Sequence, residues 1–154
     1  MKFTSHELVL QEVPGEVCLA FSVSNCPFRC AGCHSAYLQT DVGTILTLDL
    51  FTDILDSYKV PSTGNYPFTC ILFFGGEQHE EEFRTLLEYS QYLGLKTCLY
   101  TGANDVPTYI KANLNYLKTG PYLSESGSLL KSTTNQRLLN LDTNTDITYK
   151  FWEN

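Results

Sequence analysis

The chain has few basic residues and no long hydrophobic segment. Its 154 residues contain 10 Lys and Arg against 17 Asp and Glu, which gives a formal net charge of −7. An acidic chain without a basic stripe repels phosphate backbones, so nucleic acid is disfavoured as a partner. No segment approaches the roughly 20 apolar residues of a membrane-spanning helix, and residues 1–7 lack the apolar run of a signal peptide. We therefore expect a cytoplasmic protein with no nucleic-acid and no membrane partner.

The composition also excludes a disordered chain. Hydrophobic residues make up 43% of the sequence and charged residues 18%, which is the balance of a globular protein with a buried core. A length of 154 residues suits one such core. We therefore expect residues 1–154 to form a single domain.

Short apolar segments alternate with amphipathic ones along the chain. Segments 6–12 and 17–23 are expected to pair as an N-terminal β-hairpin around the Pro14-Gly15 turn. Further strands are expected at 68–74, 95–100 and 116–119, and helices from Thr47 to Leu55, from Glu80 to Tyr92 and from Pro107 to Asn113. The segment from Pro121 onward is rich in Ser, Thr and Asn, and 147–152 is expected to form a last strand.

Repeated strand–helix units predict an α/β fold with a parallel sheet and right-handed crossovers. A complete eight-fold barrel needs about 250 residues, so this chain is expected to form an open partial (β/α) barrel behind the N-terminal hairpin. Ligands of such sheets bind at the carboxyl ends of the strands. Three polar or glycine-rich segments follow predicted strands and should meet there: the cysteine loop at 25–34, Gly75-Gly76-Glu77 and Thr101-Gly102.

The first of these segments holds three of the six cysteines. Cys26, Cys30 and Cys33 are separated by three and two residues, with Gly32 allowing a tight turn. Clustered Cys in a reducing compartment bind metal more often than they form disulfides. Three thiolates on a cubane leave one iron open, whereas a pure electron carrier normally has four Cys ligands. Two alternatives to an iron–sulfur cluster stay open: a structural zinc site that includes His34, and a redox or structural thiol group.

The other three cysteines, Cys18, Cys70 and Cys98, lie in apolar runs and are expected to be buried core thiols. The second polar segment, Gly75-Gly76-Glu77, ends the most hydrophobic predicted strand. Its glycines allow a ligand to approach the main chain, and Glu77 can accept hydrogen bonds from an ammonium group. The same three residues are also compatible with an ordinary strand-to-helix turn.

The Cys-x-x-x-Cys-x-x-Cys loop after one strand and Gly-Gly-Glu after the next resemble the radical S-adenosylmethionine enzymes. The resemblance implies that Cys26, Cys30 and Cys33 bind a [4Fe–4S] cluster. It implies that S-adenosylmethionine chelates the open iron, and that reductive cleavage yields a 5′-deoxyadenosyl radical. The cofactor contacts that the resemblance implies are Gly32, Cys33, His34, Gly75, Gly76, Glu77 and Thr101. Many members carry an aromatic residue at the position of Gly32; here Phe28 and His34 are the candidates for a flat surface beside adenine.

Further segments are similar to the activating proteins of anaerobic (class III) ribonucleotide reductase. These segments are Tyr100-Thr101-Gly102, 117–122 and Thr134-Asn135-Gln136-Arg137. This resemblance implies an oxidoreductase that docks on the large reductase subunit and generates a glycyl radical there, with electrons from an external low-potential donor. Asn135, Gln136 and Arg137 are candidates for the docking face, or else form a turn with a solvated Arg. Two alternatives stay open: a radical enzyme for another glycyl-radical protein or a small molecule, and a non-catalytic zinc or iron–sulfur module.

Overall fold

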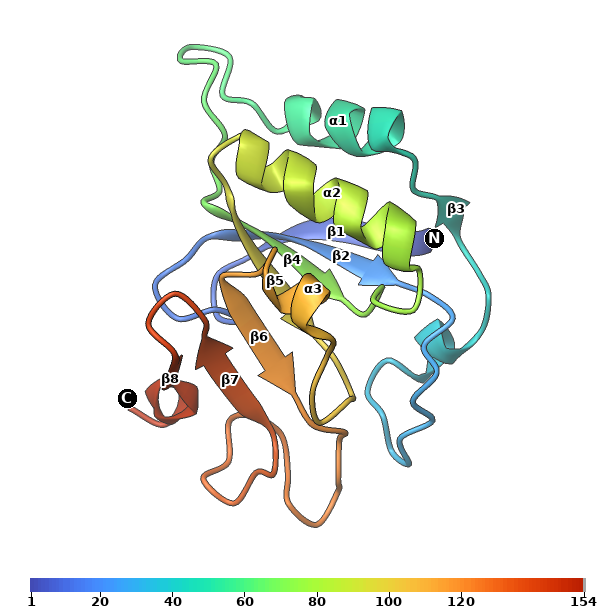
Figure 1. Ribbon diagram of the computed structural model, residues 1–154, viewed down its shortest axis with the longest axis vertical. Coiled ribbons are helices and arrows are strands. Elements are labelled where there is room, and N and C mark those ends of the chain that lie inside the picture. Colours follow the sequence, from blue (N-terminus) through green and yellow to red (C-terminus); the bar gives the residue numbers. More distant parts are fainter. Residues whose placement is uncertain (154) are drawn as a thin grey trace.

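The computed structural model describes residues 1–153 and contains one eight-stranded sheet with three α-helices (Figure 1). The strands are β1 (Lys2–Val9), β2 (Cys18–Val23), β3 (Thr44–Ile45), β4 (Cys70–Phe74), β5 (Lys96–Tyr100), β6 (Tyr116–Thr119), β7 (Arg137–Asn140) and β8 (Thr145–Asp146). The α-helices are α1 (Leu48–Ser57), α2 (Glu80–Tyr92) and α3 (Thr108–Lys111), and two 3₁₀ helices are η1 (Ala36–Gln39) and η2 (Thr148–Phe151).

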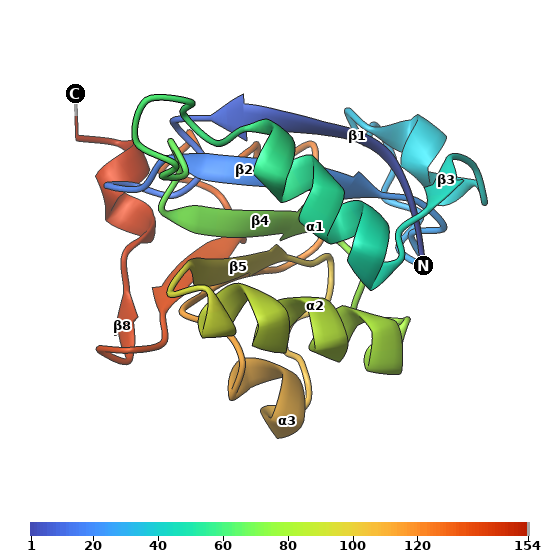
Figure 2. The same ribbon diagram turned by 90° about the horizontal axis from the view of Figure 1, so that it is seen from above.

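The sheet has the strand order β3-β1-β2-β4-β5-β6-β7-β8 and is not closed. Its four central strands, β2, β4, β5 and β6, are parallel, and antiparallel strands flank them on both sides. The predicted α/β fold, the N-terminal hairpin of β1 and β2, and the open parallel layer are therefore confirmed. Each parallel crossover contains one of the α-helices, and α1 and α2 lie over the same face of the sheet (Figure 2).

Aromatic side chains form the centre of the core between the helices and the sheet. The rings of Phe21 on β2 and Phe73 on β4 stack with centroids 5.7 Å apart. Phe51 of α1 lies 5.2 Å from Phe21, and Phe83 of α2 lies 5.2 Å from Phe73. All four side chains are fully buried. This packing holds α1 and α2 on the sheet.

The helix termini follow from local sequence. Thr47 accepts a hydrogen bond from the Leu50 amide at 3.2 Å and caps α1 as predicted. Three glutamates occupy the first turn of α2, where negative charge interacts favourably with the helix dipole. No helix within residues 1–153 has both the length and the apolar character needed to cross a membrane.

The opposite face of the sheet contains Cys18, Cys70 and Cys98, all fully buried. The prediction of core thiols is confirmed for these three residues. Burial raises the pKa of the Cys98 thiol well above its usual range, so this thiol stays protonated and unreactive at neutral pH.

The tail differs from its prediction. Residues 147–152 were expected to form a strand, and this was wrong, because η2 occupies Thr148–Phe151. The Asp146 carboxylate accepts hydrogen bonds from the amide and the hydroxyl of Thr148, at 2.8 and 2.5 Å, and these contacts begin the helical turn. Strands β7 and β8 pair antiparallel beyond β6 and were not predicted. The first strand was also misplaced, since it covers Lys2–Val9 rather than 6–12.

Candidate functional site

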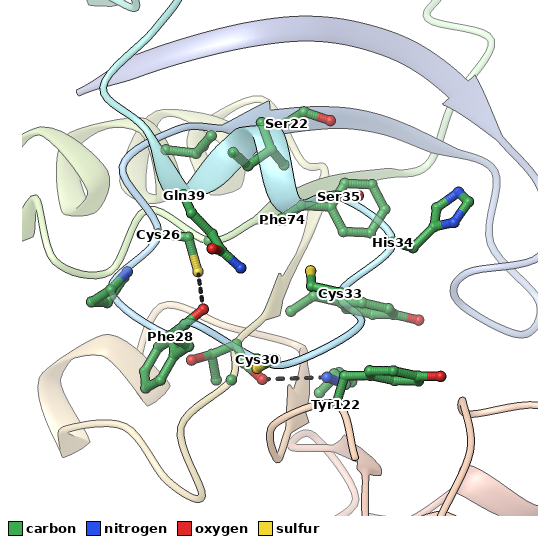
Figure 3. Close-up of a pocket in the computed structure, with 18 of the residues that line it drawn as sticks. Ser22, Cys26, Phe28, Cys30, Cys33, His34, Ser35, Gln39, Phe74 and Tyr122 are labelled. Carbon is green, nitrogen blue, oxygen red and sulfur yellow. Dashed lines mark hydrogen bonds between the residues drawn. The ribbon is translucent and has the colours of Figure 1, made fainter. Parts of the chain in front are cut away.

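A cavity of about 560 Å³ lies at the carboxyl ends of the four parallel strands (Figure 3). Its lining includes seven of the nine residues predicted to bind the cluster or the cofactor: Cys26, Cys30, Cys33, His34, Gly75, Glu77 and Thr101. The other two, Gly32 and Gly76, lie in the adjoining loops and are absent from the lining. The structure therefore brings the cysteine loop, the Gly-Gly-Glu turn and Thr101 to one place, as the strand ends predicted.

The cysteine loop is closed on itself by main-chain hydrogen bonds. Asn25, in the left-handed region with a φ of 62°, directs the chain out of β2. The amides of Asn25 and Cys26 donate to the carbonyls of Thr40 and Leu38, at 3.0 and 2.9 Å, so that η1 holds the base of the loop. Cys33 N donates to Cys30 O at 3.2 Å across a turn in which Gly32 has a φ of 72°. These main-chain hydrogen bonds fix the course of the loop.

The three loop thiols are free and half-buried, and they surround one space in Figure 3. Burial raises the pKa of the Cys26 thiol, a hydrogen bond with the Phe28 backbone opposes that rise, and negative charge at Glu77 and at the other two thiols adds to it. Three thiols beside a carboxylate suit a cationic centre, whose binding releases the thiol protons. Within residues 1–153, no three His, Cys, Asp or Glu side chains are arranged tightly enough to hold a single metal ion.

The Gly-Gly-Glu turn needs its glycines for two reasons. Gly75 and Gly76 have φ values of 83° and 119°, which residues other than glycine rarely adopt. A Cβ at Gly76 would also lie 3.0 Å from Met1 Sδ and 3.1 Å from the Phe83 ring. Gln78, which sequence reasoning missed, donates to Asn25 O at 3.1 Å and ties this turn to the cysteine loop.

Glu77 presents one hydrogen-bonded and one unpaired oxygen. Thr101 Oγ1 donates to Glu77 Oε1, and Ala103 N donates to Thr101 Oγ1 at 2.9 Å, so the carboxylate is held in position from β5. Among residues 1–153, Glu77 Oε2 is buried and has no hydrogen-bond partner. A buried acceptor without a partner is costly, and in a cavity wall it marks a place for a donor from a ligand.

Lys118 on β6 is a cavity residue whose role the sequence did not indicate. It is only 7% exposed, and its ammonium donates to Gly120 O at 2.9 Å and to Thr101 O at 3.4 Å. Burial lowers the pKa of Lys118 to about 8, while negative charge at Cys30 and Cys33 acts to raise it. A Lys in a short strand reads as a surface residue, and no local sequence signal places it in a cavity.

The aromatic residues around the cavity differ in what they contact. Phe28 packs closely on Gly102, where a Cβ would lie 2.7 Å from its ring. His34 is exposed, and its ring points away from the three thiols in Figure 3. Tyr122 lines the cavity and is the side chain nearest to Gly32, with Tyr122 Cε1 3.7 Å from the position of a Cβ there. An aromatic ring from a distant segment thus lies beside the residue that precedes the third cysteine.

The Asn135-Gln136-Arg137 segment divides between the cavity and the surface. Gln136 is buried, lines the cavity and donates to Gly120 O at 3.3 Å. Asn135 Nδ2 donates to Pro121 O at 2.9 Å. Arg137 is exposed and donates to Thr134 O and Gln136 O, at 2.7 and 2.8 Å. These contacts hold together the two ends of the loop between β6 and β7, which lines the cavity.

Comparison with known proteins identifies no relative. No family model, no curated protein and no solved structure matches the chain. The site is therefore characterised by its own chemistry: three half-buried thiols, a buried carboxylate oxygen without a partner and a buried ammonium group around one cavity.

Proposed function

We propose that the chain is a radical S-adenosylmethionine activase that generates a glycyl radical on the large subunit of an anaerobic ribonucleotide reductase. The observation that carries this proposal is the meeting of the cysteine loop, the Gly-Gly-Glu turn and Thr101 in one cavity at the strand ends. Its volume of about 560 Å³ lies within the range of small-molecule sites, about 300 to 1,000 Å³.

The residues present fit a [4Fe–4S] cluster bound by Cys26, Cys30 and Cys33. All three thiols are free, and among the described residues that line the cavity no other side chain is a thiol. One iron would therefore have no protein ligand, and a substrate can bind an open coordination position. When bound, the cluster and S-adenosylmethionine together supply a 5′-deoxyadenosyl radical for hydrogen-atom abstraction, with the electron coming from an external low-potential donor.

The protein's own part is to bind and orient the cofactor. Glu77 Oε2 is the acceptor for the methionyl ammonium, and Thr101 fixes the carboxylate that makes this contact. Gly75 leaves the main chain open to the ligand at the end of β4. Tyr122 is the candidate flat surface for the adenine, in place of Phe28, whose ring packs on Gly102, and of His34, which is exposed.

A protein substrate suits the rest of the cavity's surroundings. The cofactor would take up most of the cavity, so a target that arrives as an extended main-chain loop fits better than a second bulky small molecule. Tyr37 lines the cavity and is 56% exposed, and Leu130, beside the lining residue Leu129, is 67% exposed. Exposed apolar side chains at the rim of a site are typical of surfaces that contact another protein.

The test begins with anaerobic reconstitution with iron and sulfide, followed by S-adenosylmethionine and a strong reductant. The proposed function requires 5′-deoxyadenosine to appear, and requires its loss in the Cys30→Ala variant. A fully loaded cluster beside intact S-adenosylmethionine would contradict it, and is the result expected of a non-catalytic iron–sulfur module. A protein that takes up zinc in a closed site would contradict it as well.

The partner is tested with the reconstituted protein and candidate glycyl-radical proteins. A glycyl radical signal in electron paramagnetic resonance should appear on the large subunit of anaerobic ribonucleotide reductase. The same signal on another glycyl-radical protein alone would keep the radical chemistry and replace the partner. Product formation from a small molecule, without any protein radical, would replace the activase by a small-molecule enzyme.

A further inference from the structure

Lys118 carries a buried positive charge that has no counter-ion among residues 1–153. Its side chain is among the least exposed of the polar residues, at 7%. Among residues 1–153 it forms no ion pair; its ammonium instead contacts two carbonyl oxygens and lies 5.9 Å from the centre of the Tyr100 ring. An ammonium group loses much hydration energy on burial, and neutral partners replace that energy only in part. An unpaired buried charge beside a cavity therefore indicates a partner that the cavity supplies.

The groups that face this ammonium are few. Of the residues that line the cavity, Lys118 is the one Lys or Arg, and Glu7 and Glu77 are the carboxylates. Glu77 Oε1 accepts from the Thr101 hydroxyl, whereas the Lys118 ammonium donates to the Thr101 carbonyl. Glu7 is exposed on strand β1. The remaining ionisable groups of the lining are His34, the phenols Tyr37, Tyr100 and Tyr122, and the thiols Cys26, Cys30 and Cys33.

Cys30, Cys33 and Lys118 line the same cavity. Thiolates at Cys30 and Cys33 and the ammonium of Lys118 attract each other, because Coulomb attraction lowers the energy of both partners. Tyr122, which follows Lys118 by four residues, lies against Gly32 between the same two thiols in the chain. The end of β6 and the second half of the cysteine loop are thus adjacent.

We propose, on the basis of the function proposed above, that Lys118 is the fixed counter-charge that makes the cluster on the cysteine loop easier to reduce. Reduction adds one electron from the external donor, with no bond made or broken, and makes the thiolate-bound cluster more negative by one charge. A positive charge in a desolvated wall stabilises the reduced form more than the oxidised form, and local charge is one of the determinants of cluster potential. Lys118 acts through this field and is a positioning residue that touches no reacting atom.

A purely structural role makes a different prediction. The two carbonyl contacts of Lys118 tie the end of β6 to the end of β5, and Gln136 also donates to Gly120 O. If these hydrogen bonds were the whole role, a neutral donor at position 118 would change stability but leave the potential unaltered. A positive charge at position 118 is required only if the field at the cluster matters.

The experiment measures the midpoint potential of the reconstituted cluster without S-adenosylmethionine, by redox titration followed with electron paramagnetic resonance. Lys118→Met and Lys118→Gln should shift the potential to a more negative value, and Lys118→Arg should largely preserve it. Lys59→Met is the matched control, because it removes the same charge from an exposed site after α1, and its potential should equal that of the parent protein. Where Lys118→Met does not fold, Lys118→Gln, which keeps a hydrogen-bond donor, decides the question.

An unchanged potential in a fully loaded Lys118→Gln protein would overturn this inference. So would an unchanged potential combined with weaker binding of S-adenosylmethionine, because Lys118 would then serve the ligand's carboxylate. Both results leave the proposed function intact. If the parent protein takes up no reducible cluster, the proposed function itself fails.

Discussion

Replacing Glu77 with Gln should weaken ligand binding and raise the stability of the ligand-free protein. The two effects have opposite signs because Glu77 Oε2 is buried without a partner. A hydrogen bond from an ammonium to a carboxylate contributes about 1.5–3 kcal/mol. Its loss corresponds to a roughly 10- to 150-fold weaker affinity for S-adenosylmethionine. The side chain of Gln has nearly the same shape, and its oxygen can still accept from Thr101.

The gain in stability comes from removing a poorly hydrated charge. Glu77 is half-buried, so the relief is on the order of 1 kcal/mol, less than for a fully buried carboxylate. For a chain of this size that corresponds to a rise of about 2–4 °C in Tm. Urea denaturation of the metal-free protein measures the gain in stability, and equilibrium dialysis of the reconstituted protein measures the loss of affinity.

Two variants serve as controls for Glu77→Gln. Glu7→Gln removes a carboxylate that also lines the cavity but is exposed, and it should change neither quantity by much. Thr101→Val removes the hydroxyl that holds Glu77, and it should weaken binding without adding stability. Equal affinity in Glu77→Gln and the parent protein would refute the reasoning, and so would a loss of stability that accompanies the loss of binding.

Three further predictions concern other parts of the chain. Cys30→Ala should abolish iron uptake, whereas Cys98→Ala should leave the iron content unchanged. Cys98→Ala should cost about 1–2 kcal/mol of stability in urea denaturation, because it removes a fully buried thiol. Loss of iron in Cys98→Ala would contradict the assignment of Cys98 as a core thiol. Burial would raise the pKa of Glu16, but hydrogen bonds, first among them that from Lys96, lower it below 4.5. The stability that Glu16 contributes should therefore be present above about pH 4.5 and be lost as the pH falls through the lowered pKa. Glu16→Gln should cost about 1–2 kcal/mol of stability at pH 7. In this variant the urea midpoint should depend less on pH in the acid range, and ligand affinity should be unchanged. Tyr122→Leu should weaken binding of S-adenosylhomocysteine several-fold but leave methionine binding unaffected, which calorimetry can measure; an equal loss for both ligands would show that Tyr122 does not contact the adenine.

These variants should affect either stability or ligand binding, because the residues concerned lie at opposite ends of the strands. Glu16 precedes β2 and accepts hydrogen bonds from Lys96 at the start of β5 and from Tyr116 at the start of β6. The cavity lies at the opposite, carboxyl ends of the same strands. The residues that stabilise the sheet around Glu16 and the residues proposed to bind the ligand therefore lie at opposite ends of the same strands.

Local patterns in the sequence determined most of the central fold and the main elements of the site. Thr47 and the spacing of Phe51, Ile54 and Leu55 predicted α1, because a cap and an apolar stripe depend on residues within two or three turns. The spacing of Cys26, Cys30 and Cys33, and the glycines at 75 and 76, likewise act over a few residues. Their meeting could be predicted as well, because parallel strands place their carboxyl ends along one edge.

Contacts between distant segments were decided only by the tertiary structure. Tyr122 reaches Gly32 across 90 residues of sequence, and Lys118 is buried beside a cavity that the cysteine loop and the β6–β7 loop also line. No periodicity reports such a contact, since the free energy that places each side chain comes from neighbours on other strands. Strand β8 has two residues, too few for an alternating pattern, and pairing with β7 gives it its conformation. The sequence thus specified the cysteines, glycines and carboxylate of the site, while packing between remote strands placed the Lys118 ammonium and the Tyr122 ring beside them.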